Sequence, residues 1–470
     1  MENNSNSFFD KLNTWMRNSL TFKLFTIGFL ILILLIPIAM IQSIINERKN
    51  LRDNATQEIS SKWGDDQVIG GPVISIPYRE TVKNNEDKTE KTEVRYAHFL
   101  PEKLAIAGDI KTEKRQRGIY TVVLYNSKLQ IEGHFNTLEL EKLDVAASKL
   151  ELNNAFISLG ISDLKGVREK MMLTLNGTEY ALDPGVTSND IFASGVSIPV
   201  KINATGGMDF KLTLDLNGSS SIYFLPFGKE TNANLTSQWG SPSFEGSFLP
   251  DARTVEANGF KANWKVLHLN RNYPQQGTGS FISTGEIDNN INNSRNNDND
   301  YAVATQNNGS HAAEFGVRLM LPVDEYQKTM RSAKYSVMFV ILTFLVVFFS
   351  EILRGVRVHA IQYLLVGFAI SLFYLLLLSF SEHSSFNKAY LIASAAILAL
   401  IAFYVHAIFK NPTTTLIITT TLAILYGFFY TLLQLEEYAL LLGSLGLLLI
   451  LAGVMYLTRN IDWYNIRAKA

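Results

Sequence analysis

The feature of this sequence that most restricts its fold is a C-terminal part with very few charged residues. Residues 335–458 contain eight Asp, Glu, Lys or Arg side chains among 124 residues, whereas the other 346 residues contain 77. About a quarter of the residues in a soluble domain are charged. The C-terminal part lies far below that share and the rest lies close to it. We therefore predict a membrane protein with a large water-facing part, not a single soluble domain.

Six apolar stretches are long enough to cross a bilayer, whose hydrocarbon core of about 30 Å requires roughly 20 residues of helix. These stretches are Leu24–Ile45, Tyr335–Leu353, Ile361–Phe380, Ala389–Phe409, Thr415–Leu433 and Tyr438–Leu457. The last five follow one another closely. The sequence therefore predicts six transmembrane helices, five of them in an α-helical bundle at residues 335–457.

The first stretch has two interpretations, a cleaved signal peptide or a permanent anchor. Lys11, Arg17 and Lys23 precede it, as basic residues precede a signal-peptide core. Its apolar run of 22 residues is longer than the roughly 7–15 residues of such a core, and no small-residue cleavage site follows. We favour an uncleaved anchor at residues 24–45, preceded by a short N-terminal segment at 1–23.

The distribution of Lys and Arg predicts the orientation, because short cytoplasmic segments are enriched in them. With the N-terminus inside, the short inner segments carry nine such residues and the short outer loops carry only Lys388. Basic residues beside the segment 46–334 point the other way, but long domains are translocated largely regardless of charge. We expect both termini, including a tail at 458–470, in the cytoplasm and residues 46–334 outside.

The outer segment has the alternating pattern of β-strands. Phe210–Leu216 alternates apolar and polar residues and meets Asn217-Gly218, the strongest short hairpin signal. Met171–Leu175 leads to a second Asn-Gly pair at 176–177. We predict a large β-rich domain that is sandwich-like, with hairpin turns at both Asn-Gly pairs.

Four shorter segments of this domain carry separate predictions. Helical periodicity is confined to Leu138–Leu152 and Asp324–Lys334. Gly70–Tyr78 is expected to form a turn and a short strand bounded by prolines. Asn289–Asn299 has seven asparagines in eleven positions. Because it cannot bury apolar area, we expect a flexible loop at 289–299.

Composition and missing motifs argue against several chemistries. The 42 basic and 43 acidic residues balance, so no basic face for nucleic acid is expected. The absence of cysteine excludes disulfides, thiolate metal sites and thiol nucleophiles. No P-loop, HExxH or GxSxG occurs, and the histidines show no metal-ligating spacing. Three tryptophans could stack on a sugar, but core packing is their commoner role. We expect no catalytic residue, cofactor or metal.

Polar residues at the span ends are the remaining candidates, because charged groups in membranes are often functional. Glu351 is expected to pair with Arg354, one helical turn away. Glu382 and His383 end the third span. They could form a ligand or proton-relay site or only cap the helix, and the cap is the favoured interpretation. No charge lies near mid-span, which argues against an ion-coupled carrier.

Several blocks resemble the CreD-type family of bacterial inner-membrane proteins, called cell envelope integrity proteins. The blocks are Gly71–Pro77, Gly246–Pro250, Ala333–Tyr335, His359–Gly367, Ser381–His383 and Leu457–Tyr464. At position 247 an acidic residue is expected instead of serine. The most specific membrane-interface residues are His359, Gln362, Arg459, Asn460, Asp462 and Trp463. The resemblance covers nearly the whole chain and brings no catalytic residue with it.

The resemblance implies a bacterial inner-membrane location and a role in envelope maintenance. We expect a non-enzymatic protein that supports or senses cell envelope integrity, with a periplasmic domain that binds an envelope ligand or protein. The alternative is a transporter or flippase-like protein that moves a lipid or envelope precursor. A third, weaker option is an envelope hydrolase without a recognisable motif. The bilayer is the expected partner, nucleic acid is not, and the sequence leaves the oligomeric state open.

Overall fold

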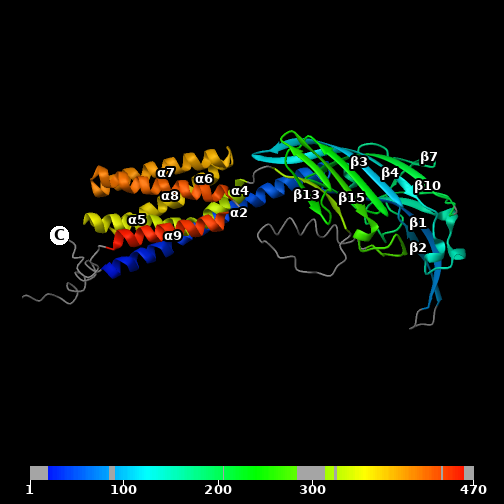
Figure 1. Ribbon diagram of the computed structural model, residues 1–470, viewed down its shortest axis with the longest axis horizontal. Coiled ribbons are helices and arrows are strands. Elements are labelled where there is room, and N and C mark those ends of the chain that lie inside the picture. Colours follow the sequence, from blue (N-terminus) through cyan, green and yellow to red (C-terminus); the bar gives the residue numbers. More distant parts are fainter. Residues whose placement is uncertain are drawn as a thin grey trace, which may run out of the picture. The chain divides into compact units, whose positions relative to one another are not determined.

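The computed structural model describes residues 20–83, 90–204, 206–282, 313–321, 325–435 and 438–459. The predicted loop at Asn289–Asn299 lies outside these residues. The chain divides into two compact units (Figure 1). We call residues 1–52 and 323–470 the helical unit and residues 53–322 the β unit.

The helical unit is a set of long apolar helices with one short amphipathic helix. The helices are α2 (Leu20–Trp63), α4 (Glu325–Lys334), α5 (Ser336–Arg354), α6 (Ala360–Ser381), α7 (Phe386–Phe409), α8 (Pro412–Gln434) and α9 (Ala439–Thr458). Five of them, α2 and α5 to α8, are long and apolar enough to cross a membrane. In the described part of α9 the apolar section Leu440–Tyr456 is shorter. The predicted fold class, membrane helices joined to a β-rich domain, is confirmed.

Helix α2 is longer than the predicted anchor, which ended at Ile45. Its buried residues recur every three or four positions along one face, namely Ile27, Leu30, Leu34, Ile38, Ile41 and Ile45. Beyond Ile45 the sequence turns polar but contains no helix breaker before Gly64, whose φ is +143°. Apolarity ends at the expected position, whereas the helix continues to Trp63.

The β unit consists of two sheets. The first has the strand order β13-β17-β11-β1-β5-β9-β8, with β2 beside β1 and β16 beside β2. The second has the order β14-β15-β12-β3-β4-β10-β6-β7. The strands of the first sheet are β1 (Gln67–Lys83), β2 (Glu90–Phe99), β5 (Phe156–Ile161), β8 (Asp183–Pro184), β9 (Gly195–Pro199), β11 (Ser221–Phe224), β13 (Pro242–Gly246), β16 (Gln276–Thr278) and β17 (Phe315–Leu319). Those of the second are β3 (Lys103–Arg117), β4 (Tyr120–Phe135), β6 (Met172–Leu175), β7 (Thr178–Ala181), β10 (Met208–Ser219), β12 (Glu230–Ser237), β14 (Ala252–Glu256) and β15 (Gly259–Leu267).

Both sheets contribute to one hydrophobic core, as the predicted sandwich requires. Aromatic rings join the sheets directly. Phe244 of β13 contacts Phe260 and Trp264 of β15, with ring centres 5.6 and 5.7 Å apart. Trp264 also lies 5.6 Å from Phe315 of β17. Trp264 and Trp239 are 2% and 8% exposed, so neither ring forms a platform for a sugar.

The two Asn-Gly pairs have different structures. Asn176 and Gly177 have φ of 47° and 82° and join β6 to β7, so this predicted hairpin is confirmed. The hairpin predicted at Asn217-Gly218 is wrong. Strand β10 continues through both residues, which pair with Asn126 and Tyr125 of β4. A Cβ at Gly218 would collide with the Tyr125 hydroxyl, so this glycine is needed for close packing.

Two other local predictions also need correction. Gly70–Tyr78 is not a short strand, because it belongs to the 17-residue strand β1, whose register shifts between Gly70 and Val73. The segment Leu138–Leu152 is not an α-helix and contains single 3-10 turns that begin at Leu140, Ala147 and Leu152. The helix predicted at Asp324–Lys334 is confirmed as α4 from Glu325 onward.

Candidate functional site

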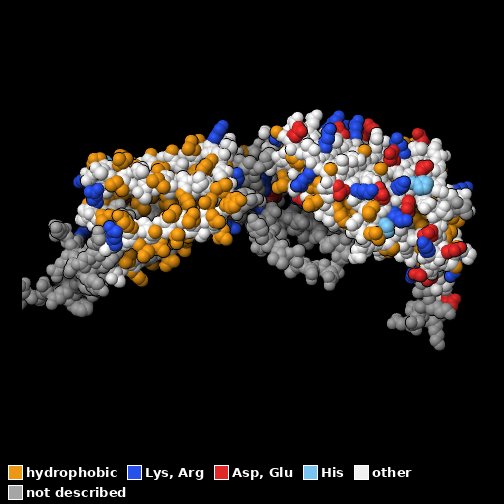
Figure 2. Space-filling view, viewed as in Figure 1, with side chains coloured by type: hydrophobic (Ala, Val, Ile, Leu, Met, Phe, Trp, Pro, Cys, Tyr) orange, Lys and Arg blue, Asp and Glu red, His pale blue; other side chains and the backbone are white. Residues whose placement is uncertain are grey.

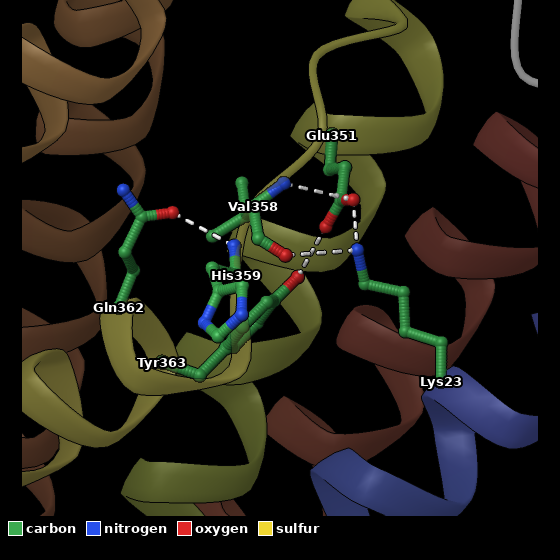
Figure 3. A network of polar contacts seen from close by, with 6 residues as sticks. All are labelled: Lys23, Glu351, Val358, His359, Gln362 and Tyr363. Atoms are coloured by element: carbon green, nitrogen blue, oxygen red, sulfur yellow. Dashed lines mark hydrogen bonds and ion pairs between the residues drawn. The ribbon is translucent and has the colours of Figure 1, made fainter. Parts of the chain in front are cut away.

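A carboxylate network lies where α5 ends and α6 begins (Figure 3). Glu351 of α5 is 8% exposed and accepts a hydrogen bond from Lys23 of α2. It also accepts from the Tyr363 hydroxyl at 2.9 Å and from the Val358 backbone N–H at 3.1 Å. Lys23 donates in addition to the Val358 carbonyl at 3.2 Å. The network joins three helices, and we call this end of the helical unit the Lys23 end.

Glu351 does not form the contact that its sequence neighbours suggested. Its described ion pair reaches Lys23, which lies 328 positions away in the chain, and not Arg354. Gly355, with φ of +66°, ends α5 directly after Arg354. The Arg354 side chain is exposed, whereas Glu351 is buried against α2 and α6. Local sequence patterns could not indicate this pairing, because the partner belongs to a helix distant in the chain.

His359 and Gln362, two of the predicted interface residues, form the N-terminal cap of α6. The His359 backbone N–H donates to Gln362 Oε1 at 2.8 Å, and the Ile361 backbone N–H donates to His359 Nδ1 at 3.4 Å. This reciprocal arrangement is a capping box, which satisfies backbone groups that have no partner within the helix. The two residues therefore fix the start of α6, from which Tyr363 reaches Glu351 (Figure 3).

Glu382 lies at the opposite end of α6, which we call the Glu382 end. Its side chain is 9% exposed and accepts from the Tyr326 hydroxyl of α4 at 3.1 Å. Arg48 Nε of α2 lies 3.7 Å from the Glu382 carboxylate. Arg52, one turn further along α2, places its guanidinium 5.4 Å from the centre of the Tyr326 ring, within cation–π range. This cluster joins α2, α4 and α6.

His383 is adjacent to Glu382 in sequence, but its described contact is made elsewhere. Its ring is exposed, and its Nδ1 lies 3.2 Å from the carbonyl oxygen of Ser379 in the same helix. Of the two predicted site residues, Glu382 contacts other helices, whereas His383 contacts its own. The described contacts therefore do not join the pair into one relay.

The two polar clusters mark two ends of a long contact between α2 and α6. Midway along it, Leu34 of α2 is fully buried, and a Cβ at Gly367 of α6 would collide with its methyl groups. Arg48 follows Leu34 by 14 residues, and Glu382 follows Gly367 by 15. At 1.5 Å per residue these separations are about 21 and 22 Å, so both contacts fit helices that run in the same direction.

Aromatic side chains of α5 to α8 pack together in the half of these helices nearer the Glu382 end. Phe373 of α6 lies 5.4 Å from Tyr390 of α7 and 5.0 Å from Tyr426 of α8, between ring centres. Phe339 of α5 lies 4.4 Å from Tyr426 and 5.2 Å from Phe429. All five rings are at most 5% exposed. The five rings thus form one buried cluster nearer Glu382 than Glu351.

Comparison with known proteins identifies the family of this chain. The model of the family described as "Inner membrane protein CreD" matches residues 19–464. The chain belongs to the CreD family. A protein of Escherichia coli K12, described as inner membrane protein CreD, is 34% identical over 454 residues, which are 96% of this chain and 95% of that protein. The membrane role expected from the apolar helices agrees with this membership.

Family membership confirms the resemblance, and the structure shows where some of its residues lie. His359 and Gln362 cap α6, as described above. Arg459, the last described residue, stacks its guanidinium 4.2 Å from the centre of the Tyr456 ring. The other signature residues, Asn460, Asp462 and Trp463, lie outside the described part of the chain.

In the β unit of this CreD-family protein, the structure brings together a serine, a histidine and an aspartate that sequence spacing did not reveal. Ser75 of β1 and His98 of β2 are directly opposite in the sheet, with Ser75 Oγ 2.8 Å from His98 Nδ1. His98 Nε2 lies 3.1 Å from Asp190 Oδ2. Hydrolases use the same three residue types, but Ser75 and His98 are 2% and 1% exposed. The arrangement therefore serves as a buried link between two strands and the segment that carries Asp190.

The environment of His98 favours its neutral form. Burial lowers the pKa of His98 below its usual value of 6.5, because the imidazolium ion loses hydration there. The hydrogen bond and the negative charge of Asp190 act in the opposite direction but are the smaller effects. A neutral ring can accept from the Ser75 hydroxyl while it donates to Asp190, which satisfies all three groups.

Proposed function

We propose that this CreD-family protein supports or senses the integrity of the bacterial cell envelope and is not an enzyme. In this proposal the β unit lies in the periplasm and binds an envelope ligand or protein, while the helical unit anchors it in the inner membrane. Both termini are proposed to lie in the cytoplasm, since Lys and Arg dominate the short segments on that side.

The observation that carries this proposal is the aromatic packing among α5 to α8. A transporter needs a path that water or substrate can enter, and polar groups along that path. Here the buried rings of Phe373, Tyr390 and Tyr426 pack against one another among α6, α7 and α8 in the half nearer the Glu382 end. The carboxylates instead tie helices together at the two ends. Such a bundle is suited to anchoring a domain rigidly.

Two further observations favour a non-enzymatic role. The Ser75 hydroxyl is buried, so a substrate carbonyl has no access to it in this structure. Within the described residues, no group of three or more His, Asp or Glu side chains is placed to hold a metal ion. The buried serine supports the proposal of a non-enzymatic protein, because hydrolysis by an activated serine requires access to its hydroxyl.

The proposed role can be tested with the intact protein. A strain that lacks the gene should lose resistance to detergent and lysozyme, and the full-length chain should restore it. Purified protein in lipid nanodiscs should co-sediment with isolated peptidoglycan sacculi, or retain lipopolysaccharide, through the β unit. Unchanged resistance in the deletion strain would contradict the envelope role. If the protein binds neither sacculi nor lipopolysaccharide, these two ligand classes are excluded.

The transporter or flippase-like alternative predicts a different result. Proteoliposomes that contain the purified protein would then move a fluorescent phospholipid between leaflets faster than empty liposomes, as measured by dithionite quenching. With the interior packed as observed, we expect equal rates. A clear acceleration that is lost when Phe373→Trp overfills the interior would favour the alternative.

A further inference from the structure

Helix α4 is strongly amphipathic, and its polar face is basic. Tyr326, Thr329 and Ala333 are 9%, 0% and 1% exposed and lie on one side of the helix. Lys328, Arg331 and Lys334 recur every third position and fall on the other side, within about 120° of arc at 100° per residue. Three cations therefore line about two turns of a single helix face.

The contacts of α4 place it at the ends of the membrane helices. It contacts α5, α6, α7 and α8. Tyr326 donates to Glu382, just past the end of α6, and the Lys328 ammonium lies 5.9 Å from the centre of the Phe386 ring, where α7 begins. Helix α5 begins two residues after α4 ends. An amphipathic helix at the end of a span lies in the interface, with its polar face among lipid head groups.

The Glu382 end of the helical unit carries many of its described basic residues. Among the residues whose side chains the structure describes, this end carries the cations Arg48, Lys49, Arg52, Lys328, Arg331, Lys334 and Lys388, and Glu47 and Glu382 are acidic residues there. The described cations of the Lys23 end are Lys23, Arg354, Arg357, Lys410 and Arg459, against Glu351. Figure 2 shows Lys and Arg side chains near the ends of the apolar surface that the helices form. Both ends of the helical unit therefore carry several described basic residues, as the translocation of a long domain largely regardless of charge allows.

We propose that the basic face of α4 binds the phosphate groups of anionic phospholipids in the leaflet at the Glu382 end. A basic helix face near a bilayer is attracted to anionic head groups, and the attraction increases with each Lys or Arg. Phosphatidylglycerol carries a net negative charge, whereas the ammonium group of phosphatidylethanolamine or phosphatidylcholine cancels its phosphate. The charge on α4 therefore fits the anionic class. This interaction is separate from ligand binding by the β unit.

The test uses the full-length protein in nanodiscs of phosphatidylcholine, with or without phosphatidylglycerol, and far-UV circular dichroism as the melting signal. Phosphatidylglycerol should raise the melting temperature of the natural protein. Lys328→Gln/Arg331→Gln/Lys334→Gln should lose at least half of that shift, measured against its own melting temperature in phosphatidylcholine alone. A matched control, Lys128→Gln/Lys201→Gln/Lys211→Gln, removes the same charge from exposed positions of the β unit and should keep the shift.

Three results would overturn the proposal. The first is a full melting-temperature shift in the α4 triple variant, and the second is an equal loss of that shift in the control variant. The third is a shift of the same size when inorganic phosphate is added to the natural protein in phosphatidylcholine nanodiscs. The last result would identify free phosphate as the ligand. If the α4 variant does not fold, Lys328→Arg/Lys334→Arg provides a second measurement, because it preserves charge and must retain the shift. Added salt must also reduce the shift in the natural protein.

Discussion

Leu34 of α2 packs so closely against Gly367 of α6 that no side chain larger than hydrogen fits at position 367 without movement of the leucine. Leu34 is fully buried in this contact. The contact lies between the two charged clusters that hold α2, one at Lys23 and one at Arg48. Between Lys23 and Arg48, helix α2 is therefore held by one apolar contact and two polar contacts.

The first prediction concerns this contact. Gly367→Ala should lower the free energy of unfolding of the helical unit by about 1–3 kcal/mol, because an added methyl group overpacks the interface. Adding Leu34→Val should restore part of the loss, because the shorter side chain leaves room for the added methyl group. Gly427→Ala is the control, since nothing lies within 4 Å of a Cβ there. Thermal melting in one detergent would measure all three, and an equal loss in the control would contradict the interpretation.

The second prediction separates the two possible partners of Glu351. Glu351→Gln should lower the free energy of unfolding of the helical unit by about 1–3 kcal/mol. Removing one partner of a fully buried ion pair would cost more, but the Lys23 side chain is 27% exposed. Lys23→Met together with Glu351→Gln should recover much of that loss, since no charge is left unpaired. Arg354→Gln should have little effect because its side chain is exposed. A larger loss from Arg354→Gln would instead support the pair predicted from sequence.

The third prediction concerns Glu382 and His383. Glu382→Gln should cost at most about 1–2 kcal/mol, since the amide oxygen can still accept from Tyr326 but no longer attracts Arg48. His383→Gln should change stability by less than about 0.5 kcal/mol, because the ring is exposed. Complementation of a deletion strain by the double variant tests a functional role. Full rescue would remove both residues from the candidate site.

The fourth prediction is a pH dependence in the β unit. Because the pKa of His98 is lowered on folding, the unfolded chain binds its proton first as the pH falls. Stability should be constant above pH 6.5, the usual pKa value, and should decrease below it. His98→Gln should remove the decrease between about pH 6.5 and 5, where exposed carboxylates do not yet titrate. In Asp190→Asn the loss of stability should continue to lower pH. Asp190 raises the pKa of His98, so its removal lowers that pKa further. Chemical unfolding followed by tryptophan fluorescence would show whether the variants differ in this way.

The fifth prediction tests the orientation. The chain has no cysteine, so single cysteines can be introduced as unique labels. Lys128→Cys, on the β unit, should react with an impermeant thiol reagent in cells whose outer membrane is permeabilised. Arg354→Cys, at the Lys23 end, should react only after lysis. The opposite labelling pattern would show that the helical unit is inverted.

Local sequence predicted those features whose cause is local. Of the six predicted spans, long apolar runs correctly located five helices that are long and apolar enough to cross a membrane, because the length of each run matches the thickness of the bilayer core. Alternation correctly indicated strands and a sandwich. Asn176-Gly177 forms a turn because both residues readily adopt positive φ and the flanking strands pair with each other. Asn217-Gly218 does not, because β4 pairs with β10 along its full length and Tyr125 occupies the space beside Gly218.

The polar contacts between helices depended on the tertiary structure. The sequence marked Glu351 and Glu382 as charged residues at span ends, where desolvation makes an ion costly without a partner. It could not identify Lys23 and Arg48 as their nearby cations, because these residues lie more than 300 positions away and meet the carboxylates only when α2 packs along α6. Helix periodicity fixes which side chains share a face, whereas the packing of Leu34 against Gly367 fixes which helices meet. Apolarity along the chain thus determined where the membrane helices are, and close packing between distant helices determined the partners of their charges.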